Sequence, residues 1–401
     1  MNKVFTVIFV TLMVMFAGCR NDHKESFVSL SFESDVKSPI EIPPGKINVS
    51  ASQLVGTVAD AETLVFQKTP AIFFADSNRD QTTFCTILSE SISAENIKVG
   101  ESNYDSPFSF HDQETGSLLL KEGDEPILAY QYEQKLENRV PRRYKRSTYV
   151  HPLYDLSGRV ITDDFPIDHF HHRGLSWNWP KVWVNGKRYD LWHIHGMRNE
   201  LEGLYQIFDK WTLRETGPVC ALLGIKNHWE TEDEQHVMDE NVLFRVFRKT
   251  GTGRAIDVQL TWTALESIKI SGQDKKGYGG FNLRFAPREN TQITSQAGSE
   301  ASDSNLRTYA WVDFSAQFEG QSEYSGAAVF QHPYNPDFPA GWCLRYYGYI
   351  GVAWPGLEVL ELEPGESFTL KFRLYVHDGD AAQGRVEQAY NAYQGQLMLE
   401  D

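Results

Sequence analysis

Histidines that could do acid–base or metal chemistry are concentrated in one short part of the chain. Five of the twelve histidines lie in the stretches DHFHHRG (168–174) and LWHIHG (191–196). Imidazole titrates near neutral pH and is a common metal ligand, so such a group suits proton transfer or metal binding. A single histidine usually packs in a core with one hydrogen bond, but five close together favour a functional site.

Strand alternation predicts how these side chains are presented. If both stretches are extended, alternate residues share a face, so His169 and His171 point one way and His172 the other, while His193 and His195 share a face. A hairpin-like connection between the two stretches predicts that the two pairs converge on one pocket beside Arg173. The candidate catalytic or metal-ligating side chains of these stretches are therefore His169, His171, His172, His193 and His195.

A divalent metal is one interpretation of this group, with His169, His171, His193 and His195 as candidate ligands. The helical spacing of zinc proteases is absent, and no carboxylate stands out as a further ligand. Asp168 could instead orient an imidazole from behind. No cofactor is required by the sequence, and a metal stays an open alternative.

Other polar side chains that could bind substrate occur in basic, glycine-rich and proline-rich stretches. These stretches are RRYKRSTYVHP (142–152), KKGYGGFNLRF (275–285) and FQHPYNPDFPAGWCLRYYG (330–348). Glycines allow a ligand to approach the backbone closely, and loops on a rigid sheet commonly hold binding sites. The substrate-binding candidates are Arg143, His151, Arg284, His332 and Arg345, together with Arg173, and Tyr278 is a further catalytic candidate.

Short apolar stretches separated by turn residues predict that β-strands position these side chains. In AIDVQLTWTAL (255–265), Ile256, Val258, Leu260 and Trp262 alternate with polar residues, which is typical of a half-buried strand. The Asn-Gly pair in VNGKR (184–188) predicts a hairpin. Helical patterning is confined mainly to the C-terminal end. A chain of this type is expected to form a large antiparallel sandwich preceded by a smaller one.

The N-terminal residues predict export. An apolar run over 4–16 follows Lys3 and ends at Ala17-Gly18-Cys19, which resembles a lipoprotein signal with Cys19 as the lipidated residue. The run is short for a membrane span of about 20 residues. The expected organisation is a signal peptide at 1–19, a tether at 20–27, a β-sandwich at 28–112, a catalytic β domain at 116–380, and a C-terminal helix and tail at 381–401.

Composition restricts the possible partners. The formal charge of −16 argues against nucleic acid, which requires a basic surface. The remaining cysteines, Cys85, Cys220 and Cys343, have no disulfide-framework or zinc-ribbon spacing and are expected to be buried thiols. The chain is therefore expected to be extracytoplasmic and attached to a membrane only through lipid.

These motifs together resemble a bacterial family that is labelled "methane oxygenase PmoA". The resemblance rests on YVHPLYDLSGRVITDDFPIDHFHHRGLSW, GYGGFNLRF, FQHPYNPDFPAGWCLRYYG and LYVHDG and covers about residues 120–380. The label names a membrane enzyme, whereas this chain has no long apolar span. The resemblance implies an all-β supersandwich similar to galactose mutarotase and polysaccharide lyases, and an association with sugars. Its motifs place at the site His151, Asp168, His169, His171, His172, Arg173, Tyr278, Arg284, His332 and Arg345.

Histidines, a tyrosine and arginines without an evident carboxylate pair favour one kind of sugar chemistry. Glycoside hydrolysis ordinarily uses two carboxyl groups. β-Elimination beside a uronate needs a cation for the carboxylate, a base for the neighbouring proton and an acid for the leaving oxygen. The sequence therefore predicts a lyase or dehydratase that acts on acidic oligosaccharides. The alternatives are a metal-dependent hydrolase or oxygenase and a non-catalytic sugar-binding lipoprotein.

Overall fold

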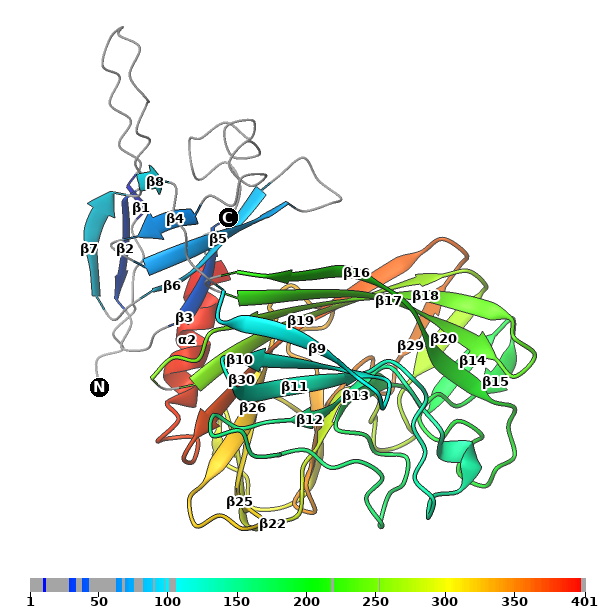
Figure 1. Ribbon diagram of the computed structural model, residues 1–401. Helices are drawn as coiled ribbons and strands as arrows, with labels where there is room; N and C mark the ends of the chain where they lie inside the picture. The colour runs from blue at the N-terminus through cyan, green and yellow to red at the C-terminus, as the bar shows by residue number, and fades with distance from the viewer. Residues whose placement is uncertain are drawn as a thin grey trace, which may run out of the picture.

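The computed structural model describes residues 106–217, 220–251 and 253–397, together with the backbone of eight strands between positions 10 and 100 (Figure 1). Residue Cys19 and most of the predicted signal peptide lie outside the described residues. Among the described residues, no helix is long and apolar enough to cross a membrane.

The eight N-terminal strands form two antiparallel sheets. The three-stranded sheet has the order β1 (Val10–Thr11), β2 (Ser29–Glu33), β7 (Ser91–Asn96). The five-stranded sheet has the order β3 (Ser38–Ile42), β6 (Thr82–Leu88), β5 (Thr69–Ala75), β4 (Thr63–Phe66), β8 (Lys98–Gly100).

The boundary of the large domain lies earlier than the predicted residue 116. Strand β9 (Phe108–Gln113) pairs along its whole length with β10 (Ser117–Glu122) and forms the edge of a large sheet. Gly116 has a φ of 73° and belongs to the tight turn between them. The limit of 112 predicted for the N-terminal domain was therefore wrong, because β9 belongs to the large sheet.

Two nine-stranded antiparallel sheets build the large domain. The first, named the β9 sheet, has the order β24 (Ser304–Thr308), β27 (Gly341–Arg345), β28 (Tyr349–Ala353), β21 (Gly280–Arg284), β13 (Leu175–Asn178), β12 (Tyr149–Leu153), β11 (Glu125–Gln131), β10, β9. The second, named the β16 sheet, has the order β16 (Leu204–Thr216), β17 (Cys220–Thr231), β18 (His236–Phe247), β19 (Gly253–Ala264), β30 (Ser367–Asp378), β26 (Ser325–Gln331), β25 (Trp311–Phe318), β22 (Arg288–Ser295), β23 (Gly298–Ser299).

One hydrophobic core joins the two sheets, so they form a sandwich and the predicted all-β class is confirmed. In Figure 1, β16–β19 cross the top of the large domain and β9–β13 lie beneath them. The alternation predicted for β19 is also confirmed, because Ile256, Val258, Leu260 and Trp262 are all buried while the residues between them are half-buried. Core residues from the two sheets include Leu118, Leu128, Trp177, Val242, Phe244 and Val258.

A four-stranded sheet at one end of the sandwich contains the predicted hairpin. Its order is β15 (Lys187–Tyr189), β14 (Lys181–Val184), β20 (Ile268–Ser271), β29 (Val359–Leu362). Asn185 and Gly186 link β14 to β15 with φ angles of 48° and 81°. Positive φ at both central residues is the requirement that makes Asn-Gly favourable in two-residue hairpins.

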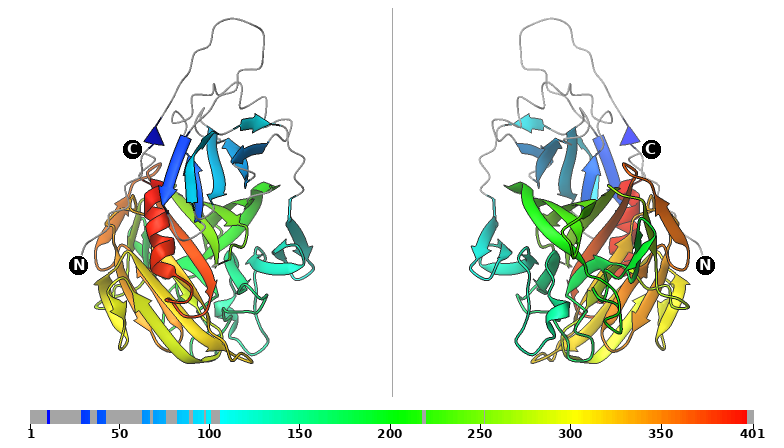
Figure 2. Two further views of the ribbon diagram at one scale, coloured as in Figure 1. Left: turned by 90° about the vertical axis from the view of Figure 1, so that its left-hand side faces the viewer. Right: turned by 90° about the vertical axis from the view of Figure 1, so that its right-hand side faces the viewer.

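Helix α2 (Val386–Leu397) covers one face of the β16 sheet (Figure 2). Val386, Ala389, Tyr390 and Tyr393 are buried in one cluster with residues of β25, β26 and β30. The helix lies in the C-terminal segment where the sequence predicts one. Cys220 and Cys343 are buried free thiols, as expected.

Candidate functional site

Four neighbouring strands of the β9 sheet bring the site segments together. These strands, in the order β28-β21-β13-β12, are contiguous in the sheet although they are distant in the chain. The 168–173 loop leads into β13, Arg284 ends β21, and Tyr347 lies in the turn between β27 and β28. The backbone N–H of Arg284 donates to the Gly174 carbonyl over 2.7 Å, so the histidine loop lies beside the end of β21.

Four imidazoles pack against one another in a group that we call the histidine cluster. Its members are His169, His171, His172 and His193. The ring centroids of His171 lie 4.4 Å from His193 and 4.6 Å from His172, and those of His169 and His172 lie 4.7 Å apart. His172 and His193 are buried and His171 is half-buried. The prediction that histidines from both stretches converge is therefore confirmed for His169, His171 and His193.

The strand alternation assumed for this segment was wrong. The 168–173 segment is a turn, in which the N–H of His169 donates to the Pro166 carbonyl and that of His172 to the His169 carbonyl. A turn removes the two-residue periodicity of a strand. His172, expected on the opposite face, consequently joins the cluster.

His195 does not join the cluster. Its Nδ1 lies 3.2 Å from the Leu201 carbonyl oxygen and its Nε2 lies 3.0 Å from the Tyr205 hydroxyl. The predicted four-histidine set of His169, His171, His193 and His195 is thus not assembled. In the part of the chain that the structure describes, no group of three or more His, Cys, Asp or Glu side chains is arranged to hold a metal ion.

A buried carboxylate orients His193, and the sequence analysis did not identify it. Asp190 Oδ2 lies 2.9 Å from His193 Nδ1, and both side chains are less than one-tenth exposed. Asp190 Oδ1 accepts hydrogen bonds from the backbone N–H groups of Trp192 and His193. Aspartate commonly caps its own following backbone in this way, so the D-x-x-H spacing was a usable signal.

Asp168 occupies the position suggested for it behind an imidazole. Its Oδ2 lies 2.9 Å from His169 Nδ1, and its Oδ1 accepts a 2.8 Å hydrogen bond from Arg284 Nη2. Partial burial acts to raise the pKa of Asp168, but His169 and Arg284 hold it below the ordinary value. The carboxylate is therefore ionised at neutral pH.

Burial and positive neighbours keep two members of the cluster neutral. Desolvation lowers the pKa of His171 well below its ordinary value, and His172, His193, His169 and Arg146 add to the effect. Burial likewise lowers the pKa of His172, with contributions from His169 and Arg284. A neutral imidazole can accept a proton or donate one hydrogen bond at physiological pH.

Aromatic rings line the histidine cluster. The Tyr347 ring stacks on His169 at a centroid distance of 4.9 Å, and the buried Tyr349 ring lies 5.1 Å from His172. Tyr278 packs on Trp192, and the centroids of these two rings lie 5.1 Å apart. Burial raises the pKa of Tyr347 to about 12, so its hydroxyl is protonated at neutral pH. Tyr347 was missed by sequence reasoning.

Two buried arginines adjoin the cluster. Arg284 retains two buried nitrogens, Nε and Nη1, without a hydrogen-bond partner. Arg284 was a predicted candidate, whereas Arg146 was not. Arg146 donates through Nη2 to the carbonyls of Leu191 and Trp192 and so supports the turn that contains Asp190 and His193.

The predicted arginine beside the pocket, Arg173, has a structural role. Its side chain is fully buried, and its Nε lies 2.8 Å from Asp164 Oδ1. Its Nη2 donates a hydrogen bond to the Tyr149 hydroxyl, and its guanidinium lies 3.3 Å from the centre of the Phe165 ring. A buried, paired guanidinium of this kind braces the β12–β13 connection and is not free for substrate.

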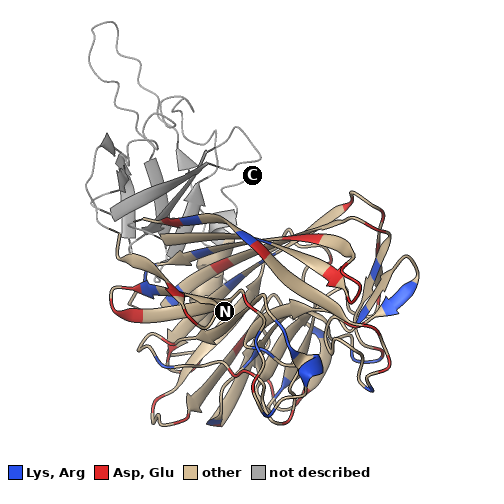
Figure 3. Cartoon of the chain, turned by 45° about the vertical axis from the view of Figure 1, so that its right-hand side comes forward, with Lys and Arg blue, Asp and Glu red and all other residues tan. Residues whose placement is uncertain are grey.

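The other predicted residues are dispersed. Arg143 belongs to the short helix η1 (Arg142–Tyr144), which is coloured blue for its arginines in Figure 3. Its guanidinium packs on the Tyr144 ring, and the centroid of that ring lies 6.3 Å from the centroid of the His171 ring. His151 contacts Thr162, and His332 packs on Tyr334 and Tyr393. Arg345 donates to the Ser304 and Leu344 carbonyls and to Asn305.

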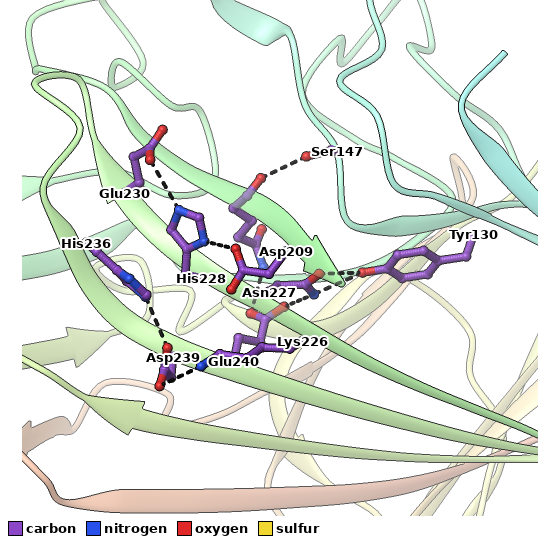
Figure 4. Close-up of polar contacts among 11 residues, drawn as sticks. Tyr130, Ser147, Asp209, Lys226, Asn227, His228, Glu230, His236, Asp239 and Glu240 are labelled. Atoms are coloured by element: carbon purple, nitrogen blue, oxygen red, sulfur yellow. Dashed lines mark hydrogen bonds and ion pairs between the residues drawn. The ribbon is translucent and has the colours of Figure 1, made fainter. Parts of the chain in front are cut away.

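A second histidine pair lies on β17 and β18 (Figure 4). The His228 ring is bracketed by Asp209 at Nδ1 and Glu230 at Nε2, and it lies 4.3 Å from the His236 ring. His236 in turn contacts Asp239. Because both nitrogens of His228 already contact carboxylates, we interpret this pair as a set of contacts within the sheet rather than an open acid–base site.

Solved structures similar to this chain are sugar-epimerase-like proteins of low identity. A galactose mutarotase related enzyme from Lactobacillus acidophilus is 10% identical with a TM-score of 0.30 and covers 68% of this chain and 98% of its own. Galactose 1-epimerase from the same organism is 8% identical with a TM-score of 0.28, covering 78% and 99%. An aldose epimerase homologue from C. elegans is 8% identical with a TM-score of 0.29, covering 69% and 100%.

No curated protein matches the chain. A family model does match, over residues 117–391, which include both large sheets except for β9 and hold every member of the histidine cluster. The chain therefore belongs to the family of unknown function DUF6807.

Proposed function

We propose that this protein is an extracytoplasmic, lipid-anchored enzyme that breaks down acidic, uronate-containing oligosaccharides by β-elimination, as a lyase or a dehydratase. The observation that best supports this is the packing of two neutral imidazoles, those of His171 and His172, with His193, which a buried aspartate holds, beside guanidinium groups that retain unpaired donors. Perturbed titratable groups gathered in this way are typical of sites that transfer protons.

His193 is the proposed base. With Asp190 accepting at Nδ1, the ring carries its proton on that nitrogen, and the lone pair of Nε2 is left to accept another. The carboxylate also stabilises the imidazolium that forms. His171, 4.4 Å away, is neutral and adds no full positive charge that would oppose this protonation.

Tyr347 is the proposed acid. The residue is 38% exposed, and burial of its ring raises its pKa, so the hydroxyl keeps its proton at neutral pH. In the reaction, His193 removes the proton from the carbon next to the uronate carboxylate. The electron pair forms a carbon–carbon double bond, the bond to the β-oxygen breaks, and Tyr347 protonates the departing oxygen.

The carboxylates of the site favour elimination over hydrolysis. Hydrolysis ordinarily uses two carboxyl groups that flank the glycosidic bond. Here Asp190 is buried and engaged with His193, and Asp168 contacts both His169 and Arg284. Elimination instead requires a cation for the substrate carboxylate, and the site has buried guanidinium groups to supply it.

The test is incubation with a panel of uronate-containing oligosaccharides, followed by mass spectrometry. Chain cleavage without added water, or loss of water, would support a lyase or a dehydratase, and the new double bond should absorb at about 235 nm. Gain of water would show hydrolysis and refute the proposal. Loss of activity on chelation would favour the metal-dependent alternative.

Asp190→Asn tests the assigned base. The amide would donate to His193 Nδ1 and move the ring proton to Nε2, so turnover should fall about 10²–10⁴-fold. Asp209→Asn changes the equivalent aspartate of the His228 pair and should leave turnover unchanged. Equal effects of the two substitutions would contradict the assignment.

A further inference from the structure

Arg284 has unused hydrogen-bonding capacity in a buried position. Its side chain is 6% exposed, and Nη2 donates to Asp168. Nε and Nη1 are buried and have no partner. Buried, unpaired donors on a charged group are unfavourable, which indicates that an acceptor belongs there.

His172 adds a second unused group beside it. Its Nδ1 is also buried without a partner, and the positive charge of Arg284 contributes to the lowered pKa of this ring. The Tyr347 ring lies 5.0 Å from the Arg284 guanidinium and 6.3 Å from the His172 ring, so the three side chains form one group. Each free N–H donor of a guanidinium can make a charge-assisted hydrogen bond to a carboxylate oxygen, and such bonds are stronger than those between neutral groups.

The other nearby arginines are held by protein partners, and Arg146 keeps only one buried nitrogen, Nη1, without a partner, compared with two for Arg284. Arg173 is enclosed by Asp164, Tyr149 and Phe165, and Arg345 donates to two backbone carbonyls and Asn305. Arg146 supports the Asp190 turn, and burial together with Arg173 lowers its pKa to about 9. Arg284 is therefore the guanidinium best placed to receive a substrate group.

We infer that Arg284 and His172 form a carboxylate-binding subsite for a sugar acid, covered by the Tyr347 ring when no ligand is bound. Tyr347 is the exposed member of the group, and outward rotation of its side chain would admit the carboxylate while leaving its hydroxyl near the leaving oxygen. This inference rests on the proposed function for the identity of the ligand as a uronate, but binding and turnover can be measured separately.

The test compares ligands that differ only at one carbon. Ligand-observed NMR titration of the full chain with D-glucuronate and with D-glucose isolates the contribution of the carboxylate, and galacturonate extends the comparison. The wild type should bind a uronate at least about 10-fold more tightly than glucose, since a charged hydrogen-bonded pair contributes about 1.5–3 kcal/mol. Equal binding of uronates and glucose, or no saturable binding of either uronate, would overturn the inference.

Variants identify the residues. Arg284→Gln combined with Asp168→Asn removes both members of the ion pair and should abolish the preference for the uronate, whereas Arg284→Lys should retain part of it. Arg307→Gln, an exposed arginine paired with Glu300, is the matched control and should bind as the wild type does. Unchanged preference in the double variant would refute the subsite.

The two proposals can fail independently. Selective uronate binding that depends on Arg284, without any unsaturated product from the oligosaccharide panel, would leave the subsite standing and refute the reaction. Unsaturated product formed equally well by the double variant would leave the reaction standing and refute the subsite.

Discussion

A buried glutamate between the two large sheets allows a prediction of stability from the structure. Glu240 on β18 is fully buried and accepts five hydrogen bonds. Its Oε1 accepts from Trp177 Nε1 and Asn227 Nδ2, each over 2.9 Å. Its Oε2 accepts from the indoles of Trp229 and Trp262 and from the Gln206 amide. Figure 4 shows Glu240 beside Asn227 and Tyr130.

Glu240→Gln keeps the shape but replaces one acceptor oxygen by an amide group. The least disruptive orientation retains the three donors now at Oε2 and turns the new amide toward Trp177 and Asn227, which leaves two buried donors facing a donor. At about 1–3 kcal/mol for each unsatisfied group, the free energy of unfolding should fall by about 2–6 kcal/mol. Removal of a buried charge offsets part of this loss.

Equilibrium unfolding in guanidinium chloride measures the effect, with tryptophan fluorescence and circular dichroism as independent probes. Because three indoles contact this carboxylate, the native emission spectrum should also change. Glu361→Gln is the control, since Glu361 forms an exposed pair with Lys269 that should contribute less than about 1 kcal/mol. A loss below about 1 kcal/mol for Glu240→Gln would refute the view that an ionised acceptor organises this part of the core.

Four further predictions follow from particular residues. His171→Ala removes the ring that packs 4.4 Å from the proposed base His193, so it should lower turnover with little change in melting temperature; a lower melting temperature with normal turnover would mean a packing role. Burial acts to lower the pKa of His377, but Asp313, whose Oδ1 lies 2.8 Å from His377 Nε2, raises the pKa overall. The pair therefore stabilises the fold fully below the unfolded-state pKa of about 6.5. This stabilisation is lost as the pH rises through the higher folded-state pKa. The difference in unfolding free energy between wild type and His377→Gln should therefore shrink as the pH rises above about 6.5; a constant difference would contradict this. Cys19→Ser should release the protein from membranes or block its maturation, and unchanged fractionation would refute the proposed lipid anchor. A chain that begins at Ser106, and so retains β9, should keep its activity if it folds, and complete loss in a well-folded protein would show that the N-terminal sheets complete the site.

The sequence by itself was sufficient for features that depend on local backbone preferences. The two-residue period of β19 specifies which side is buried, and the Asn185-Gly186 pair specifies a turn with positive φ. Both depend on residues that are adjacent in the chain. The nearness of His169 and His171 was predicted for the same reason, whereas His172 was expected on the opposite face and joins them only because the segment is a turn.

The tertiary structure alone decided which side chains complete the site. Arg284 and Tyr347 reach the histidine cluster because β28, β21, β13 and β12 are neighbours in the sheet, and strand order is not encoded in any local pattern. The direction of His195 and the pairing of Arg173 with Asp164 likewise depend on contacts outside their own segments. Hydrophobic periodicity specifies the buried face of a strand, whereas the partners of a polar side chain depend on which strands the whole core brings together.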